Sequence, residues 1–377
     1  MGAGTPAPEV VCRMLRQNGG CVMKIVVLAG GISTERDVSL VTGASVCRAL
    51  RENGHKAIFV DLFLGLEQVP DPLEALFDAP DGLCPDVKIS AVAPDLEAVR
   101  RSRADQSARL FGPHVLEVCA LADLVFLGLH GQDGEDGRIQ AAFDLLGIRY
   151  TGGGYLGSGM AMDKSITKMI MDQVGIPNAP WRNIPHYTEA DIPCLTEELE
   201  VPCAVKVVNG GSSLGLALPD TKEELAQALH DLLRYGSHIL VEKKIHGREL
   251  TVAVLGDRWL PAAETIPASG AFDYAAKYQP MAAGGAREIC PAEITPEQMA
   301  AAGELALRLH RALGLQVYSR TDMILDGEGN LWCLEINSLP GMTPASFVPK
   351  EAAAVGMSYN QLCEEIVRLS YEIQRKG

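Results

Sequence analysis

The sequence predicts an α/β domain followed by a separate α+β unit. A strand-helix-strand pattern opens the chain after Met23, and a series of short strands around one helix begins after Pro202. Between the two patterns lies a glycine-rich stretch, residues 150–159, which is typical of a linker. A chain of 377 residues is long enough for two or three domains that each bury a core.

The first domain is expected to begin with a βαβ unit. An apolar run after Lys24 leads into the pair Gly30-Gly31, and a helical pattern and a second apolar run follow. A further buried strand ends at His130. Strands are expected over residues 24–29, 57–63 and 123–129, and helices over about 38–53 and 139–146. The residues before Met23 show no periodicity, and we expect a disordered extension or an incorrectly assigned start.

The second unit is expected to begin with a helix that the sequence Gly-Ile-Pro closes at residues 175–177. Short apolar runs bounded by turn residues follow, as in a small α+β domain. Strands are expected over residues 203–208, 216–218, 239–243 and 250–255, and helices over 162–174 and 222–233. Two domains joined by a glycine-rich linker form a natural cleft for a nucleotide.

A β-hairpin near the C-terminus carries the most informative polar residues. The sequence D-G-E-G-N is typical of a tight connection between antiparallel strands. Strands are expected over residues 316–325 and 331–336, with a loop over 327–330. This loop puts Asp322 opposite Glu335, and the period of two adds Asn337 to the same face. A slip of one residue would turn Asp322 away.

Oxygen ligands of this kind favour Mg²⁺ or Mn²⁺, and Mg²⁺ usually binds beside the phosphates of a substrate. The hairpin therefore predicts a divalent-metal site formed by Asp322, Glu335 and Asn337. The alternative is an ordinary surface hairpin with solvated acids.

Composition excludes several classes of protein. The formal net charge of −15 argues against a nucleic-acid partner, because nucleic-acid binders concentrate Lys and Arg. The ten cysteines form neither a C-x-x-C pair nor a cluster at zinc spacing, which suits reduced thiols in a cytosol. No apolar stretch is long enough to span a bilayer, so no membrane partner is expected. We expect a cytoplasmic protein that acts on small molecules.

Residues 206–215, K-V-V-N-G-G-S-S-L-G, leave a buried strand and enter a Gly/Ser loop. The backbone N–H groups of such a loop, with the hydroxyl of Ser212, can bind terminal phosphates while Lys206 supplies positive charge. The stretch is not a Walker A sequence, and a plain turn is the alternative.

Residues 239–249 are a strand edge followed by a turn. Glu242 could accept a hydrogen bond from the amino group of adenine, and the main chain near Lys243 and Ile245 could bind the ring nitrogens. Glu249 could accept from ribose hydroxyls. A solvated sheet edge is the alternative.

Two polar segments follow strands of the first domain. G-G-I-S-T-E-R-D-V-S contains Glu35, and L-H-G-Q-D-G-E-D-G contains His130. Ligands of α/β sheets bind at the carboxyl ends of the strands, so both residues are expected to face a ligand. A helix cap at Ser39 and an exposed acid at Glu35 are the alternatives.

Together these segments form an ordered set of motifs: G-G-x-S-x-E-R-x-V-S, L-H-G-x-x-G-E-D-G, Y-T-G-x-G followed by A-M-D-K, G-S-S-x-G, V-E-x-x-x-x-G-x-E, D-Y-x-x-K-Y and L-E-x-N-x-x-P-G-M-T. The set resembles that of the D-alanine–D-alanine ligases of the ATP-grasp superfamily, over residues 24 to about 369. The resemblance implies a Rossmann-like α/β domain followed by a two-part ATP-grasp module. The implied boundaries are 1–22 for the extension, 23–151 for the N-terminal α/β substrate domain, 152–243 for the central ATP-grasp subdomain and 244–377 for the C-terminal, metal-binding subdomain.

The implied activity is the ATP-dependent ligation of two D-alanines through a D-alanyl phosphate, which gives the dipeptide that ends peptidoglycan precursors. ATP and two Mg²⁺ or Mn²⁺ ions are the implied cofactors, and a homodimer is expected from the family alone. The alternatives are a ligase that joins D-alanine to D-serine or D-lactate, and a catalytically silent nucleotide-binding regulator with the same fold.

The resemblance also assigns roles to residues. Glu35 would hold the ammonium of the first substrate, with His130 near its carboxylate. Arg320 and the backbone of Gly341 would stabilise the charge that develops on the acyl phosphate and tetrahedral intermediate, and Ser346 would bind the second carboxylate. The implied nucleotide contacts are Lys164, Lys206, Ser212, Glu242, Lys243, Ile245, Glu249 and Lys277, with Tyr278 beside Lys277 on a lid. Asp322, Glu335 and Asn337 would hold the metal ions.

The sequence departs from the family pattern in three places. Gly210 stands in N-G-G-S where an acid-Gly-Ser sequence is more usual, so a contact between the phosphate loop and the lid can be missing. Ala345 lies in P-A-S where many relatives have Ser-His-Ser, which affects the second-substrate side. Residues 65–119 are longer than in compact members and receive no role.

Overall fold

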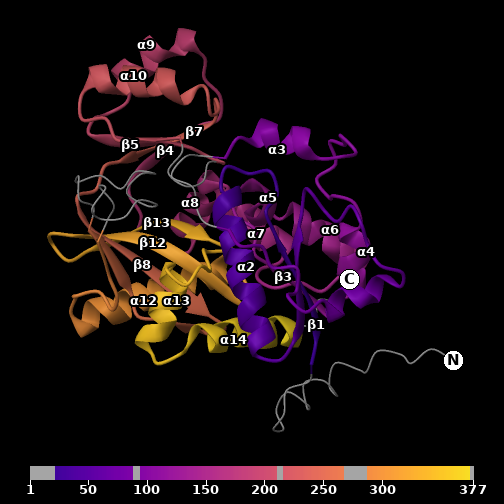
Figure 1. Ribbon diagram of the computed structural model, residues 1–377. Coiled ribbons are helices and arrows are strands. Elements are labelled where there is room, and N and C mark those ends of the chain that lie inside the picture. Colours follow the sequence, from indigo (N-terminus) through magenta and orange to yellow (C-terminus); the bar gives the residue numbers. More distant parts are fainter. Residues whose placement is uncertain (1–21, 88–93, 210–214, 267–286, 374–377) are drawn as a thin grey trace. The chain divides into compact units, whose positions relative to one another are not determined.

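The computed structural model describes residues 22–87, 94–209, 215–266 and 287–373 (Figure 1). The chain divides into two compact units. The first unit consists of Met1–Gly134, Arg138–Gly154 and Gly341–Gly377, and the second of Glu135–Gly137 and Tyr155–Pro340. None of the described helices combines the length and the apolar character that crossing a membrane requires. The domain boundaries expected from the sequence stay a prediction.

A parallel sheet of three strands, in the order β2-β1-β3, lies at the centre of the first unit. The strands are β1 (Lys24–Ala29), β2 (Lys56–Asp61) and β3 (Leu124–Leu127). From Ile25 onward every side chain of β1 is fully buried, as expected for a parallel strand that helices cover. Helix α2 (Arg36–Glu52) joins β1 to β2 and packs against both, which confirms the expected βαβ unit.

Shorter helices surround this sheet. They are η1 (Leu73–Asp78), α3 (Leu96–Ser102), α4 (Val115–Leu121), α5 (Gln132–Glu135) and α6 (Arg138–Leu146). The first two lie in residues 65–119, for which no clear pattern was found, and α4 begins there. None of the residues of α3 is buried, so this helix has no apolar periodicity that the sequence could reveal.

The C-terminal segment belongs to the first unit and contains α13 (Phe347–Ala354) and α14 (Tyr359–Glu372). The apolar residues of α14 recur every three or four positions and face α2. They are Leu362, Cys363, Ile366 and Val367, each at most 1% exposed. A capping box between Ser358 and Gln361 fixes where α14 begins.

The second unit contains a four-stranded antiparallel sheet in the order β4-β7-β5-β6. Its strands are β4 (Trp181–Ile184), β5 (Cys203–Val207), β6 (Leu216–Ala217) and β7 (Ile239–Lys243). Helices η2 (Glu189–Asp191), α9 (Ile192–Glu198) and α10 (Lys222–Leu232) accompany it. Figure 1 shows α9 and α10 on one side of this sheet, and the buried side chains of Leu225 and Leu229 from α10 pack with Val205 of β5.

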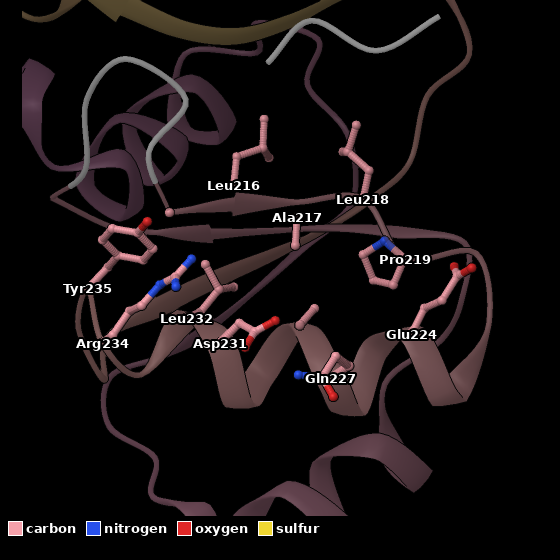
Figure 2. Close-up of a pocket in the computed structure, with 12 residues that line it drawn as sticks. Leu216, Ala217, Leu218, Pro219, Glu224, Gln227, Asp231, Leu232, Arg234 and Tyr235 are labelled. Carbon is pink, nitrogen blue, oxygen red and sulfur yellow. The ribbon is translucent and has the colours of Figure 1, made fainter. Parts of the chain in front are cut away.

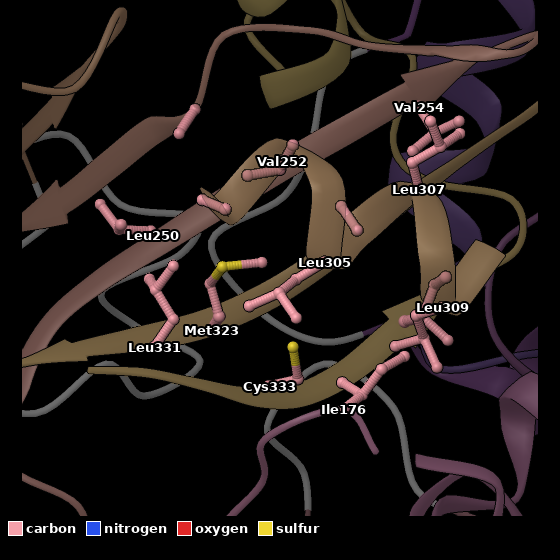
Figure 3. Close-up of a cluster of buried hydrophobic side chains, with 14 of the residues drawn as sticks. Ile176, Leu250, Val252, Val254, Leu305, Leu307, Leu309, Met323, Leu331 and Cys333 are labelled. Atoms are coloured by element: carbon pink, nitrogen blue, oxygen red, sulfur yellow. The ribbon is translucent and has the colours of Figure 1, made fainter. Parts of the chain in front are cut away.

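A six-stranded sheet completes the second unit, with strand order β11-β10-β8-β12-β13 and β9 beside β8. Its strands are β8 (Gly247–Leu255), β9 (Arg258–Trp259), β10 (Ala263–Ile266), β11 (Arg287–Ile289), β12 (Tyr318–Asp326) and β13 (Leu331–Asn337). The helices of this part are α7 (Tyr155–Met162), α8 (Lys164–Gln173) and α12 (Pro296–Ala312). Figure 3 shows the core between sheet and helix, where Val252 and Met323 lie near Leu305 of α12.

One parallel sheet with two antiparallel sheets confirms the expected combination of an α/β domain and an α+β unit.

Candidate active site

The candidate metal ligands lie on the hairpin of β12 and β13. Asp322 pairs with Glu335 and Arg320 pairs with Asn337, so the expected pairing of the two acids is confirmed. Along β12, buried residues such as Thr321 alternate with half-buried ones. Arg320 and Asp322 therefore lie on the face that points away from the core.

A β-bulge at Leu334 produces this pairing. Near the turn Leu325 pairs with Leu331, so the loop is one residue longer than the sequence predicted. That register, if continued, would pair Asp322 with Leu334. The register shifts between Met323 and Asp322. Leu334 is the extra, unpaired residue of β13 at this shift, and Glu335 therefore lies opposite Asp322.

The bulge also decides which face the end of β13 presents. Cys333 and Ile336 are both buried although they are three residues apart. Regular alternation from Cys333 would bury Glu335 in the core. The extra residue leaves Glu335 and Asn337 half-buried on the face of Asp322 instead. Apolar residues three apart within a strand pattern are the sequence signal for this bulge.

Asp322 is held by neighbours on both sides. Arg320 donates from Nε to Oδ1 at 2.9 Å and from Nη2 to Oδ2 at 2.7 Å, and the hydroxyl of Thr251 on β8 donates to Oδ1. Burial disfavours the charged guanidinium, but the Asp322 carboxylate outweighs it and holds the pKa of Arg320 above its usual value.

The donor set suits a hard divalent cation, because two carboxylates and an amide oxygen share one face. The amide nitrogen of Asn337 lies 3.5 Å from Oδ2 of Asp322, which places the side chains close together. Across the described part of the chain, no group of three or more His, Cys, Asp or Glu side chains could hold a metal ion. An ion at the hairpin would therefore draw its remaining ligands from water or substrate oxygens, as Mg²⁺ commonly does.

Lys164 approaches the same face from helix α8. Its ammonium lies 3.5 Å from Oε2 of Glu335. Asp163 caps the helix by accepting hydrogen bonds from the backbone N–H groups of Ser165 and Ile166, so the sequence A-M-D-K fixes where α8 begins. The cap thereby sets the direction from which Lys164 reaches Glu335.

Lys206 on β5 is the second lysine expected at the phosphates, and it forms an ion pair. Its Nζ lies 2.5 Å from Oε2 of Glu242 on β7, and Nζ of Lys168 on α8 lies 2.5 Å from Oε1 of the same carboxylate. Burial alone would lower the pKa of Lys206, but Glu242 outweighs it and raises that pKa. The adenine contact expected of Glu242 stays a prediction beside the observed ion pairs.

Lys168 is the site residue that the sequence analysis missed. It lies on the buried face of α8 near Thr167 and Met171. A lysine on the apolar face of a helix is a usable signal, because a fully buried lysine requires a paired charge.

The other residues expected to contact adenosine come soon after Glu242 in the chain, at the end of β7, in the next turn and on β8. Lys243 ends β7 and is exposed, and Ile245 is half-buried in the turn. Glu249 on β8 pairs with Ile324, two residues from Asp322 on β12, so it lies on the face of the six-stranded sheet that carries Asp322.

In the first unit, Glu35 and His130 lie at the ends of neighbouring strands. The hydroxyl of Ser33 donates to the backbone carbonyl of His130 at 2.7 Å and accepts from the backbone N–H of Glu35 at 3.2 Å. The His130 ring contacts the hydroxyl of Thr42 at 2.9 Å. Gly131 has φ +73°, and a Cβ there would lie 3.2 Å from the Glu35 carboxylate. The first unit thus brings Glu35 and His130 together.

The first unit also holds Gly341 and Ser346. The Ser346 hydroxyl lies 2.8 Å from that of Thr343 and accepts from the Thr343 backbone N–H at 3.1 Å. A Cβ at Gly341 would come within 2.9 Å of this hydroxyl, so a larger residue there would displace the Ser346 side chain. Ser212, Lys277, Tyr278 and Gly210 lie outside the described residues.

A pocket of about 470 Å³ opens between β6 and α10 (Figure 2). Its lining includes Leu216, Leu218 and Asp231, and none of the candidate site residues. It therefore contributes nothing to the chemistry described above.

Comparison with known proteins agrees with this arrangement. A family model described as "D-ala D-ala ligase N-terminus" matches residues 24–153, and one described as "D-ala D-ala ligase C-terminus" matches residues 170–368. The chain belongs to the D-alanine–D-alanine ligase family. The two matches together span both units, so the membership covers almost the whole described chain.

Individual relatives are similar over nearly their full length. A D-alanine–D-alanine ligase of Pediococcus pentosaceus is 40% identical over 346 residues, which are 92% of this chain and 97% of that protein. The Lacticaseibacillus casei ligase is 38% identical over 94% of this chain and 98% of that protein. A crystal structure of the Bacillus anthracis ligase complexed with ATP has a TM-score of 0.68 and 26% identity, covering 93% of this chain and 98% of that one. This likeness confirms the ATP-grasp fold.

Proposed function

We propose that this protein ligates two D-alanines with ATP, through a D-alanyl phosphate, to give D-alanyl-D-alanine, ADP and phosphate. Relatives that are 38–40% identical bear the name of this activity, and a solved relative carries ATP. The observation that carries the proposal is the shared face of the six-stranded sheet, where Asp322, Glu335 and Asn337 lie beside Arg320.

In the first step, the carboxylate of one D-alanine attacks the γ-phosphorus of ATP, and ADP leaves as the acyl phosphate forms. In the second, the amine of the other D-alanine attacks the acyl carbon, loses a proton and displaces phosphate. Two anions must meet in the first step, so fixed positive groups lower its barrier. In this proposal Lys164 and Lys206 contact the phosphates, and Arg320 stabilises the charge on the acyl phosphate and the tetrahedral oxyanion.

Asp322, Glu335 and Asn337 would hold two Mg²⁺ or Mn²⁺ ions, which supply positive charge against the phosphate tail when bound. In the same proposal Glu35 binds the first ammonium and His130 lies near the first carboxylate. The backbone of Gly341 donates to the oxyanion. Adenosine contacts are assigned to Glu242, Lys243, Ile245 and Glu249. Ser212, Lys277, Tyr278 and Ser346 keep the roles that the family implies.

The test is ADP release with D-alanine alone, with L-alanine alone, and with D-alanine together with D-serine or D-lactate, with each product identified by mass. We expect D-alanyl-D-alanine from D-alanine and no product from L-alanine alone. A depsipeptide or a D-alanyl-D-serine product at comparable rate would favour the ligases with a different second substrate. ATP binding without D-alanine-dependent ADP release would contradict catalysis and favour a regulator.

We also propose that the protein acts as a homodimer in the cytoplasm, as the family resemblance implies. Sedimentation velocity at micromolar concentration tests the first point, and a species with the mass of one chain would contradict it.

A further inference from the structure

A buried cluster of three charges lies beside the proposed phosphate site. Glu242 is 2% exposed, and each of its carboxylate oxygens has an ammonium at 2.5 Å, Oε1 that of Lys168 and Oε2 that of Lys206. The side chain of Lys168 is 1% exposed and that of Lys206 is 12% exposed. Lys206 is therefore the member that can reach a ligand, and Lys168 is the member that cannot.

Lys168 also binds the strand that carries a proposed metal ligand. Its Nζ donates to the backbone carbonyl of Cys333 at 3.2 Å. Cys333 lies on β13 immediately before the bulge at Leu334, which turns Glu335 to the face of Asp322. One lysine on α8 thus connects β7 of the four-stranded sheet with β13 of the six-stranded sheet.

The charges explain why a lysine is needed at this position. Burial acts to raise the pKa of Glu242, and the ammonium groups of Lys206 and Lys168 outweigh it and keep that pKa below its usual value. Without Lys168, one oxygen of a fully buried carboxylate would lose its partner, which is costly. The carboxylate would relieve this loss by turning both oxygens toward Lys206, and that movement withdraws the Lys206 ammonium from a ligand.

We infer that Lys168 is a positioning residue of the nucleotide site: it holds the Glu242 carboxylate so that Lys206 is presented to phosphate, and it fixes β13 where the bulge presents Glu335. The inference rests on the proposed function, because it takes the ligand of Lys206 to be a nucleotide phosphate. Lys168 acts through Glu242 and Cys333 and does not touch the ligand.

The experiment is calorimetric titration of the purified full-length chain with ADP in the presence of Mg²⁺, combined with thermal unfolding without nucleotide. The variants are Lys168→Met, Glu242→Gln and the double variant. Methionine keeps most of the length of the unbranched side chain and removes its charge. We expect Lys168→Met to lower the thermal midpoint and to raise the dissociation constant for ADP by roughly tenfold or more.

The double variant separates positioning from packing. If Lys168 acts through Glu242, the two losses of binding free energy are not additive, and the double variant binds ADP more tightly than the sum of the two losses predicts; a loss beyond that of Glu242→Gln belongs to the contact with Cys333. It should also recover part of the thermal midpoint, because no unpaired carboxylate remains in the core. If Lys168→Met alone does not fold, Lys168→Gln takes its place in the cycle, because its amide lacks the charge but can still donate a hydrogen bond.

Lys222→Met is the matched control. Lys222 on α10 donates to the backbone carbonyls of Thr196, Glu197 and Leu199 at the end of α9. Its loss should lower the midpoint without changing ADP affinity.

Two results would overturn the inference. One is a Lys168→Met variant that binds ADP within about twofold of the wild type. The other is a pair of additive losses in the double variant. A wild-type chain that binds no ADP would contradict the proposed function instead, so the two failures are distinguishable.

Discussion

Asp322 has two tasks at the scale of a single residue. Its carboxylate pairs with the Arg320 guanidinium at 2.7 Å, and it is one of the proposed metal ligands. The side chain remains 23% exposed, so a ligand can reach it despite these contacts. Removing its charge should therefore affect chemistry more than folding.

We expect Asp322→Asn to lower kcat by roughly a hundredfold or more, because the amide keeps the shape and deletes a negative charge that holds cations. Steady-state rates across a Mg²⁺ titration measure the effect, and the circular dichroism spectrum should not change. Glu328→Gln in the exposed turn of the same hairpin is the matched control and should keep the wild-type rate. A near-normal rate in Asp322→Asn would show that the hairpin is not the metal site.

His310 shows how burial creates pH dependence away from the site. Its ring is 3% exposed and bonds the hydroxyl of Ser319 at 2.7 Å, and burial lowers its pKa to about 4. The unfolded chain binds the proton near pH 6.5, so stability is present above that pH and is lost as the pH falls toward 4. The full loss is about 3 kcal/mol.

We expect His310→Gln to lose less stability than the wild type on acidification. The measurement is the urea midpoint of both chains at several values of pH between 7.5 and 4.5, a range chosen around the ordinary histidine pKa of about 6.5. Parallel pH dependence in the two chains would assign the acid sensitivity to other groups.

At the scale of the element, the hairpin turn is organised by Asp326. Its carboxylate accepts from the indole N–H of Trp332 at 2.8 Å and from the backbone N–H groups of Asn330 at 2.8 Å and Glu328 at 3.0 Å. These donors hold the pKa of Asp326 at about 2. The contribution of the turn is therefore present above pH 3.8 and declines as the pH falls toward 2.

We expect Asp326→Ala to lower the thermal midpoint and to reduce ligase activity by roughly tenfold, because the turn sets the register from which the bulge positions Glu335. Differential scanning calorimetry and the ADP-release assay measure the two effects. Glu328→Ala, at the tip of the same turn, should change neither. Unchanged activity in Asp326→Ala would mean that β8, not the turn, fixes the register of β12.

At the scale of the whole molecule, the end of the chain returns to the first unit. Four side chains of α14 are at most 1% exposed, and α14 packs against α2. Burying a large apolar side chain contributes about 1.5–3 kcal/mol. Three of the four, Leu362, Ile366 and Val367, are of this size, and together they approach the total stability of a typical domain, about 5–15 kcal/mol.

A chain that ends at Ala354 should therefore lose the folded first unit. Limited proteolysis should cleave residues 24–134 rapidly and leave fragments of the second unit. A chain that ends at Ile373 is the control and should resist cleavage like the wild type. A truncated chain with the wild-type pattern would show that α14 is dispensable.

Much of this organisation follows from local patterns. The apolar run of β1 and the glycines after it predicted the βαβ unit, because a parallel strand buried on both faces leaves a continuous apolar signal. The hairpin and the pairing of its two acids were also predicted from turn chemistry and alternation, but the loop is one residue longer than expected and the bulge at Leu334 was not predicted. The three short helices η1, α3 and α4 were not predicted, because helices of six or seven residues contain too few turns for apolar periodicity to be recognised.

The sequence by itself determined the family and the ordered motifs, because these are read along the chain. It also predicted that Asp322 faces Glu335, although the loop is one residue longer than expected and a bulge restores the pairing. Only the tertiary structure decided that Leu334 bulges, that Lys168 enters the core to meet Glu242, and that α14 covers α2. These outcomes depend on contacts between residues far apart in the chain. Local signals, such as apolar residues three apart in a strand or a lysine on an apolar helix face, indicate that something unusual occurs but do not identify the partner.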